Sequence, residues 1–285
     1  MIARLRRAAQ RRPLVLLYHR VATLDDDRWH LAVSPKHFDQ QMLVLRTWFR
    51  PTPLHALLDT RGAVAVTFDD GYSDNVTSAA PILAKHRIPA TFFITTEPVT
   101  TGREFWWDEL AALADANDYA AKWQTMKRMN GSDRERALDE LARARNLGRR
   151  TRGSHRPMTV DELRRLALMP QVEIGAHTRT HACLAALDAD DERREIAGGR
   201  HELQELTQRE VTSFAYPFGG HEDYSERTVG VVREAGFRFA FRSGAGVVRR
   251  DVDPMRIPRC YVRDWNGAAF AMQLLRWLTA ADAGA

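Results

Sequence analysis

Short runs of apolar, β-branched and aromatic residues recur along the chain, and most are followed by a stretch with helical periodicity. Such runs predict buried strands, at Leu14–His19, Val64–Asp70, Ala90–Thr95, Val172–His177, Ser213–Phe218, Phe237–Ser243 and Cys260–Arg263. The amphipathic stretches predict helices, at Pro35–Trp48, Asn75–Arg87, Thr159–Leu168, Asp190–Leu206, Ser225–Ala235 and Ala268–Leu278. Strands that alternate with helices predict an α/β fold with a parallel sheet, either open or closed into a barrel.

One segment interrupts this alternation. From about Glu97 to Pro157 the sequence contains no convincing strand, and it shows helical patterns at Trp107–Ala116, Tyr119–Met129 and Asp133–Leu147. We interpret residues 97–157 as a helical insertion in a βα connection. Since no internal repeat is present, residues 1–285 are predicted to form a single domain that carries this insertion.

Composition and charge narrow the class of protein. With 44% hydrophobic and 28% charged residues, the 285-residue chain is neither disordered, collagen-like nor a coiled coil. The net charge of +5 would suit a nucleic-acid partner. However, the arginines are spread along the chain among acidic residues and no nucleic-acid-binding motif is present, so we expect none. The two cysteines, Cys183 and Cys260, are far apart, which excludes a disulfide framework.

The sequence also bears on location. No apolar run approaches the roughly 20 residues that span a bilayer. The run from Pro13 to Tyr18 is too short for a signal-peptide core, and no small-residue cleavage site follows it. We therefore expect a soluble, cytoplasmic protein. A peripheral contact with a membrane surface is an alternative, through the basic residues Arg4, Arg6, Arg7, Arg11 and Arg12.

Two adjacent carboxylates, Asp69 and Asp70, stand at the end of an apolar strand and precede Gly71, which permits a sharp turn. Parallel α/β folds place catalytic groups at the carboxyl ends of their strands. One carboxylate of such a pair can bind a metal ion while the other works as a base. The alternative is an acidic turn that only caps the helix beginning near Asn75.

A pair of histidines, His177 and His181, follows another predicted strand. This spacing lets both imidazoles face one point if the intervening turn is helical. Two histidines and one carboxylate are a typical zinc ligand set that leaves a position open for water. Two nearby histidines are equally often ordinary polar residues, but in combination with the two aspartates they favour a metal site.

Two further segments carry weaker signals. The strand Ser213–Phe218 ends in Pro217 and two glycines, so its backbone could approach a ligand and offer N–H groups, although an ordinary buried strand would look the same. His19 ends the first apolar run, where a lone histidine is more often structural than catalytic.

In this order, the four segments resemble the polysaccharide deacetylase family (NodB homology, carbohydrate esterase family 4). The sequence TFDDG at 67–71 matches the first motif of that family, and HTRTH at 177–181 matches its second motif, H-[ST]-x-x-H. The opening YHRV and the FAYPFGG loop look like the branch that includes the poly-N-acetylglucosamine deacetylases. The resemblance runs from Leu14 to about Trp265 apart from the insertion, and it implies a distorted (β/α)7 barrel rather than an open sheet.

The resemblance also implies roles for the site residues. It makes Asp69 the general base, and it makes Asp70, His177 and His181 the ligands of one divalent metal ion, with Zn²⁺ expected and Co²⁺, Ni²⁺ or Mn²⁺ as alternatives. Many members take their general acid from a C-terminal L-x-H motif, which this sequence lacks. The poly-N-acetylglucosamine branch implies His19 as the acid instead.

The third motif departs from the family pattern R-x-P-[YF], because Ala215 stands at the arginine position. The oxyanion contact in the family comes from backbone N–H groups, so it survives this change. The expected substrate and oxyanion contacts are Tyr216, Phe218 and Gly219. The residue that orients Asp69 is then expected to be Arg259, with Arg263 as the alternative.

The implied reaction is removal of N-acetyl groups from an amino-sugar-containing glycan, or from a lipid- or nucleotide-linked amino sugar. A deformylase, an O-acetyl esterase, a cyclic-amide hydrolase and a non-catalytic carbohydrate-binding relic are the alternatives. Phe105-Trp-Trp107 could form a sugar platform, but a helix anchor explains it better. Cys183 is expected to pack near the site without binding the metal.

Overall fold

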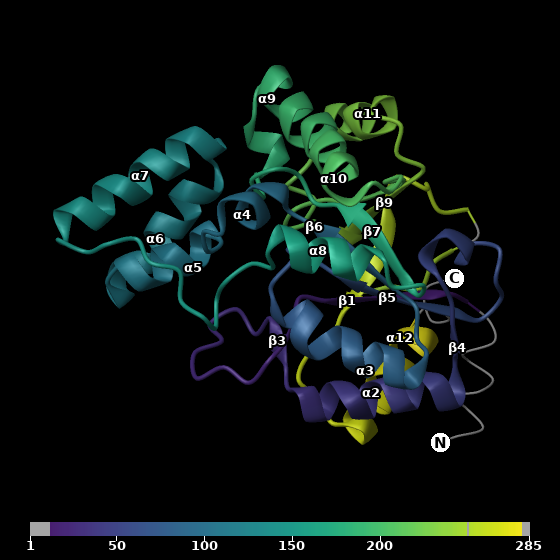
Figure 1. The fold of residues 1–285 in the computed structure, drawn as a ribbon. Coiled ribbons are helices and arrows are strands. Elements are labelled where there is room, and N and C mark those ends of the chain that lie inside the picture. Colours follow the sequence, from purple (N-terminus) through teal and green to yellow (C-terminus); the bar gives the residue numbers. More distant parts are fainter. Residues whose placement is uncertain (1–11, 250, 281–285) are drawn as a thin grey trace.

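The computed structural model describes residues 12–249 and 251–280 (Figure 1). Of the basic residues considered for membrane contact, Arg4, Arg6, Arg7 and Arg11 lie outside these ranges. Within the described residues, no helix is both long enough and apolar enough to cross a membrane.

Parallel strands form a closed barrel, as the resemblance implied, and the open sheet is excluded. Its seven members are β1 (Leu14–Tyr18), β5 (Ala63–Phe68), β6 (Ala90–Ile94), β7 (Val172–Ala176), β8 (Ser213–Ala215), β9 (Phe239–Ser243) and β10 (Ile257–Tyr261). The sheet closes because β1 pairs with both β10 and β5. Strands β7 and β8 pair through only one residue pair, Ala176 and Phe214, so the barrel is irregular between these two strands. A short strand, β4 (Arg50–Pro51), is added beside β5.

Helices cover the outside of the barrel (Figure 1). They are α2 (Pro35–Trp48), α3 (Ala80–His86), α8 (Val160–Ala167), α9 (Ala189–Arg193), α10 (Gly199–Thr207), α11 (Glu226–Glu234) and α12 (Gly267–Ala280). Two helices that the sequence predicts as continuous contain π-helical turns, at Asn75–Ala79 before α3 and at Arg194–Gly198 between α9 and α10.

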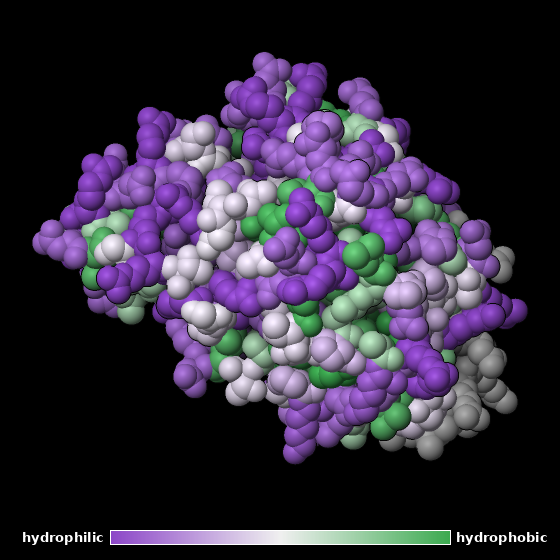
Figure 2. Space-filling view, viewed as in Figure 1, coloured by the Kyte–Doolittle hydropathy of each residue, from purple (hydrophilic) through white to green (hydrophobic). Residues whose placement is uncertain are grey.

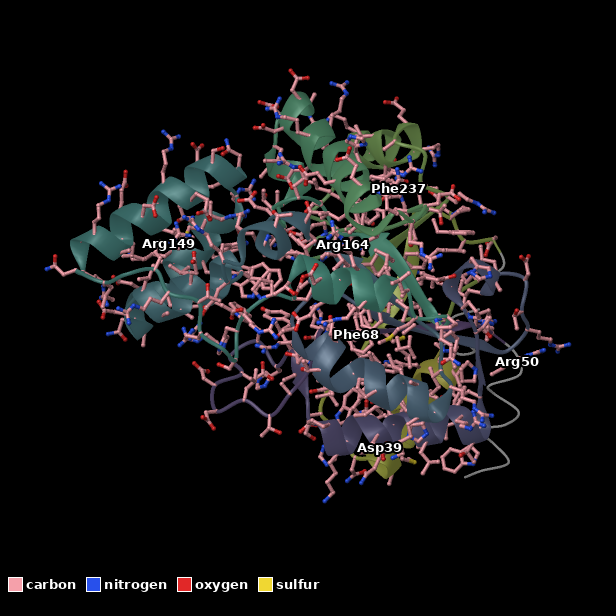
Figure 3. All side chains as sticks on the ribbon, in the orientation of Figure 1. Asp39, Arg50, Phe68, Arg149, Arg164 and Phe237 are labelled. Carbon is pink, nitrogen blue, oxygen red and sulfur yellow. The ribbon has the colours of Figure 1, made fainter. Side chains whose placement is uncertain are left out.

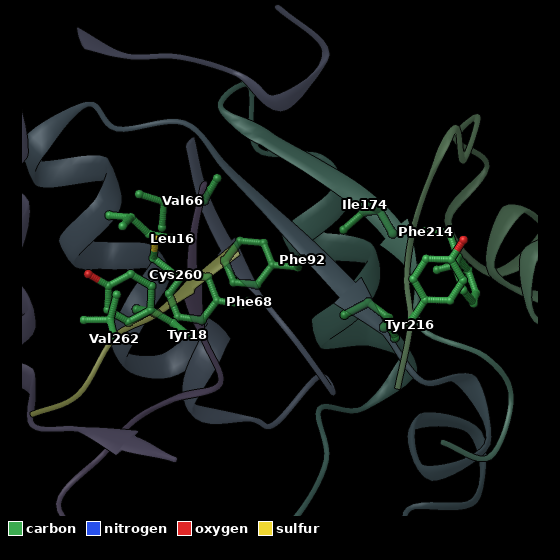
Figure 4. Close-up of a cluster of buried hydrophobic side chains, with 14 of the residues drawn as sticks. Leu16, Tyr18, Val66, Phe68, Phe92, Ile174, Phe214, Tyr216, Cys260 and Val262 are labelled. Atoms are coloured by element: carbon green, nitrogen blue, oxygen red, sulfur yellow. The ribbon is translucent and has the colours of Figure 1, made fainter. Parts of the chain in front are cut away.

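Strand side chains alternate between two apolar cores. One set, which includes Leu16, Val66 and Phe92, packs between the strands and the covering helices (Figure 4). The other set, which includes Phe93 and Phe241, fills the barrel interior. Because both faces of the strands are buried, the strands appear in the sequence as continuous apolar runs.

The connection between β6 and β7 carries α4 (Thr96–Thr101), α5 (Trp106–Leu113), α6 (Ala116–Lys127) and α7 (Gly131–Ala144). Helices α5–α7 form a lobe beside the barrel with their own apolar core, and their outer surface is largely hydrophilic (Figures 1 and 2). We call these three helices the insertion lobe. The loop from Ala22 to Leu31, between β2 (Arg20–Val21) and β3 (Ala32–Val33), reaches the lobe through a hydrogen bond from Trp29 Nε1 to Tyr119 Oη of 3.0 Å.

Candidate active site

A cavity of about 220 Å³ opens at the rim where the barrel strands end. It is lined by His19, Asp69, Asp70, His177, His181 and Phe218 from the predicted site and by Trp29, Leu31, Trp107, Trp123, Ser243, Tyr261 and Arg263. Residues far apart in the sequence therefore meet because β1, β5 and β7 end at the same rim of the barrel.

Asp70, His177 and His181 face one another at the base of this cavity. Asp70 Oδ1 lies 3.6 Å from His177 Nε2 and 3.4 Å from His181 Nε2. His177 Nδ1 donates to the Ala215 carbonyl at 2.8 Å, so its Nε2 lone pair is directed at this point. All three ligand atoms lie within 4.8 Å of one another, and all three residues are buried.

The unmet carboxylate oxygen of this cluster fits a cation. Asp70 Oδ1, which faces the Nε2 atoms of both histidines, is buried and has no hydrogen-bond partner among the described residues. Burial and the adjacent Asp69 raise the pKa of Asp70, while burial lowers the pKa of His177 and of His181 and keeps both imidazoles neutral. A buried carboxylate oxygen facing two neutral imidazoles is a donor set that suits a divalent metal ion such as zinc.

Left-handed backbone conformations direct these side chains. Asp70 has φ +76°, and Gly71, which follows it, has φ +102°. Thr178 and His181 have φ +64° and +56°, and the His181 N–H donates to Thr178 Oγ1 at 3.0 Å. The two histidines thus converge through a strained loop rather than the helical turn considered from their spacing, and non-glycine residues adopt such angles at a cost of about 1–3 kcal/mol each.

Asp69 forms a bidentate ion pair with Arg259 of β10, in which both N···O distances are 2.6 Å. The Arg259 side chain is fully buried inside the barrel. Burial alone would raise the pKa of Asp69, but Arg259 and His177 outweigh burial, so the pKa lies below its usual value. Arg263, the alternative partner, instead donates to the Trp29 and His30 carbonyls at the cavity rim.

His19 follows β1 and lies half-buried in the cavity wall, with its ring 5.2 Å from that of Tyr261. Burial lowers the pKa of His19 to about 4, although Asp69 acts in the opposite direction. The imidazole is therefore neutral at pH 7.

The loop after β8 brings Phe218 to the site but not Tyr216. The Phe218 ring lies 4.7 Å from that of His181, and its N–H has no acceptor among the described residues. Gly219 has φ +69° and packs so closely on Ser243 that a Cβ would lie 2.4 Å from the Ser243 nitrogen, so glycine is required there.

Tyr216 is a correction to the predicted site. Its hydroxyl donates to the Met255 carbonyl, its N–H donates to the Phe241 carbonyl, and its ring stacks on Tyr224. Since strand pairing takes its N–H and its ring packs in the core, Tyr216 has no group that faces the cavity.

Three tryptophans in the cavity wall complete the site. The Trp107 ring, from α5, lies 4.6 Å from that of His181, and the side chain is 95% buried (5% exposed). This residue anchors the helix, as expected, and also contacts the histidine cluster. Trp29 and Trp123 pack against each other at 4.9 Å, and no sequence signal indicated either of them. Cys183 lies beside Asp223 and does not belong to the histidine cluster.

Three comparisons with known proteins bear on the family and the fold of this chain. The family model for polysaccharide deacetylases matches residues 59–240. YxkH of Bacillus subtilis (strain 168), whose name assigns it to the polysaccharide deacetylases, is 21% identical over 266 residues, which cover 90% of this chain and 74% of YxkH.

Solved structures share the fold. The Streptococcus pyogenes deacetylase PplD, in complex with acetate, matches with a TM-score of 0.66 and 16% identity over 93% of this chain and 98% of that one. IcaB from Ammonifex degensii matches with a TM-score of 0.63 and 21% identity over 94% and 97%.

The closed parallel barrel defines the fold class, a TIM-like barrel, and a cluster of carboxylates and imidazoles lies at the carboxyl ends of its strands. The chain belongs to the polysaccharide deacetylase family, with NodB homology (carbohydrate esterase family 4). Membership supports a hydrolase that deacetylates a glycan.

Proposed function

We propose that this protein is a metal-dependent deacetylase that removes N-acetyl groups from an amino-sugar-containing glycan or glycoconjugate. The observation that carries the proposal is the buried Asp70 Oδ1, which faces the Nε2 atoms of His177 and His181 and has no hydrogen-bond partner within residues 12–249 and 251–280. Family membership supplies the reaction class.

Asp70, His177 and His181 would hold the metal ion through one carboxylate oxygen and two imidazole nitrogens. A divalent ion such as Zn²⁺ would supply a Lewis acid that polarises the amide carbonyl and makes water more acidic. The left-handed loop and the Nδ1 contact of His177 hold the imidazoles in place before the substrate arrives.

Asp69 would remove the proton from the attacking water. The ion pair with Arg259 keeps this carboxylate ionised and fixes its plane, so it is oriented toward the cavity without rearrangement. Because Asp69 and Asp70 are adjacent but differently paired, the two carboxylates have different tasks.

His19 would protonate the departing amine, which is necessary because an amide nitrogen leaves poorly as an anion. Because this imidazole is neutral at pH 7, the proton would come from the attacking water by way of Asp69, and with a pKa of about 4 the imidazolium would release it readily to the amine. The Phe218 N–H would donate to the tetrahedral oxyanion, and a donor of this kind contributes about 2.7–4 kcal/mol to transition-state stabilisation.

The cavity wall suits a saccharide. Trp29 and Trp123 present aromatic surface next to the acid and histidine cluster, and apolar sugar faces pack well on such rings. Arg263 adds an exposed guanidinium at the rim, which would meet an anionic carrier if the amino sugar is linked to a phosphate-bearing lipid or nucleotide.

The test combines metal analysis of the purified protein with acetate release from N-acetylated oligosaccharides and from lipid- or nucleotide-linked N-acetylated sugars. Formylated and O-acetylated analogues belong in the same panel, since the same residues would hydrolyse them. Stoichiometric metal with acetate and free amine as products is the expected result. A protein that binds no metal, or that is inert on the whole panel, would contradict the proposal.

A further inference from the structure

The insertion lobe contacts the loop that carries His181. Arg134, on α7, donates from Nη2 to the Thr180 carbonyl oxygen at 2.6 Å and to Thr180 Oγ1 at 3.1 Å. The lobe therefore holds the backbone of the residue directly before His181.

Arg134 is an unusual anchor because it is almost fully buried, at 2% exposure. It forms no ion pair with a carboxylate of the described residues, and its Nη1 has no hydrogen-bond partner there. Its guanidinium lies 5.0 Å from the centre of the Trp106 ring. A buried guanidinium needs compensation for its lost hydration. The hydrogen bonds to Thr180 supply part of it, and the nearby negative charges of Glu195, Glu97 and Glu135 supply another part.

The other side of the same loop is held by Glu195, on the π-helical turn between α9 and α10, which cover the barrel. Glu195 accepts from the Thr180 N–H at 2.9 Å and from Thr180 Oγ1 at 2.8 Å, and it also accepts from the Arg179 N–H. Thr180 is thus clamped between a carboxylate on the barrel side and a guanidinium on the lobe. These contacts on both sides stabilise a loop that contains two residues with left-handed backbone conformations.

We infer that Arg134 is a positioning residue for the metal site. It fixes Thr180 and, through Thr180, the adjacent ligand His181. The insertion lobe therefore helps to hold the metal ligands in place. The inference rests on the proposed function, since it requires Asp70, His177 and His181 to bind a metal ion. The Arg134 side chain donates hydrogen bonds to Thr180 and, among the described residues, none to His181.

The first test compares Arg134→Met with Arg149→Met. Arg149 follows α7 and contacts the lobe (Figure 3), and its side chain is 10% exposed. Its partners are Glu109, Glu135 and Asp139, all within the insertion. Zn²⁺ affinity is measured by competition with a chelator, and the unfolding midpoint is measured for the metal-free proteins. Arg134→Met should bind Zn²⁺ about 10–100-fold more weakly, as losses next to metal ligands usually do, while Arg149→Met should lower stability without this loss of affinity.

A milder pair of variants covers the case in which Arg134→Met does not fold. A Cβ at Gly131 would lie 2.8 Å from Thr180 Cγ2, whereas a Cβ at Gly230 on α11 would meet nothing within 4 Å. Because Thr180 is held on both sides, its side chain cannot rotate away from the added methyl group. Gly131→Ala should therefore shift Thr180 as a whole and weaken Zn²⁺ binding. Gly230→Ala should leave binding unchanged. Arg134→Lys, which keeps one donor, should recover part of the affinity.

The outcomes separate the two proposals. If the wild-type protein binds no Zn²⁺, the proposed function fails. If the wild type binds Zn²⁺ and Arg134→Met and Gly131→Ala bind it equally well, the function stands and the positioning role is wrong. Equal losses of affinity in Arg134→Met and Arg149→Met, in step with equal losses of stability, would reduce Arg134 to a structural anchor and would also overturn the inference.

Discussion

Asp69 and Asp70 are adjacent in the sequence, but their carboxylates have different partners. Asp69 has both oxygens paired with Arg259, whereas Asp70 keeps a buried oxygen with no hydrogen-bond partner in the part of the chain that the structure describes. The turn at Asp70, with φ +76°, is what sends the two side chains to different partners. This difference predicts separable effects of the two conservative substitutions.

Asp69→Asn should lower kcat by about 10²–10⁴, the usual contribution of a general base, and should leave stoichiometric metal in the protein. Asp70→Asn should lose the metal together with the activity, because it replaces an anionic ligand with a neutral one. Metal content by elemental analysis and acetate release decide between them. If Asp69→Asn loses the metal and Asp70→Asn keeps it, the two assignments are reversed.

Arg259→Met should destabilise the protein strongly, since it leaves a buried carboxylate without its partner, an effect of about 3–5 kcal/mol. In an Asp69→Asn background the same substitution should cost much less, because no charge is then left unpaired. Urea unfolding of the four proteins gives the coupling energy of the pair. Independent, additive effects would show that the ion pair does not stabilise the fold.

At the residue scale, the sequence motifs predicted six residues that the structure brings to one cavity: Asp69, Asp70, His177, His181, His19 and Phe218. They were predictable because each follows an apolar run that ends at the barrel rim. Tyr216 was misplaced because the sequence does not show which groups of a loop are taken by strand pairing. The contact between Arg259 and Asp69 was an expectation from the resemblance, and its geometry depends on β10 lying beside β1.

At the scale of elements, most helices and strands were predicted to within one to three residues at each end, and the larger errors fall where the end signals are weak. Helix α2 begins and ends where its pattern predicts, since Ser34 caps it and Pro35 starts it. Strand β10 begins at Ile257, three residues before the predicted start, because Pro258 makes the run look unlike a strand interior. Each π-helical turn adds only one residue to the α-helical repeat, and the spacing of apolar residues in the sequence does not reveal so small a change.

Helix α8 offers a pH-dependent test of such an end signal. Glu162 closes the capping box with Thr159 and forms an ion pair with Arg156, and this pairing lowers the pKa of Glu162 to about 2. The folded pKa lies below the unfolded value of about 4.3, so the stabilisation is complete above pH 4.3 and is lost as the pH falls toward 2.

Glu162→Gln should therefore lower the free energy of unfolding at pH 7 and should differ less from wild type at pH 3. Asp161→Asn is the matched control, because this neighbouring carboxylate is exposed and only distantly paired with Arg164, at 3.6 Å. Urea unfolding at both pH values measures the difference. A deficit of Glu162→Gln that is the same at pH 7 and pH 3 would show that the carboxylate charge contributes nothing.

At the scale of the whole molecule, the cavity exists only because three separate parts meet. The barrel supplies the acid and histidine cluster, the loop before β3 supplies Trp29, and the insertion lobe supplies Trp123. No periodicity or motif links residues that are so far apart in the chain, so the sequence predicted the chemistry of the site and not its aromatic wall. We therefore expect the aromatic wall formed by Trp29 and Trp123 to determine the substrate preference of this protein.

Trp123→Ala tests this wall. Removing the ring should raise KM for an N-acetylated oligosaccharide about tenfold, equivalent to roughly 1.4 kcal/mol of lost stacking, and should leave kcat/KM for a minimal N-acetylated monosaccharide nearly unchanged. Trp277→Ala, which removes a tryptophan that packs on Trp265, controls for general effects of the substitution. Steady-state kinetics on both substrates are the measurement. An equal loss on both would mean that Trp123 shapes the reaction centre itself, because a ring that contacts only a neighbouring sugar unit cannot affect a substrate that lacks one.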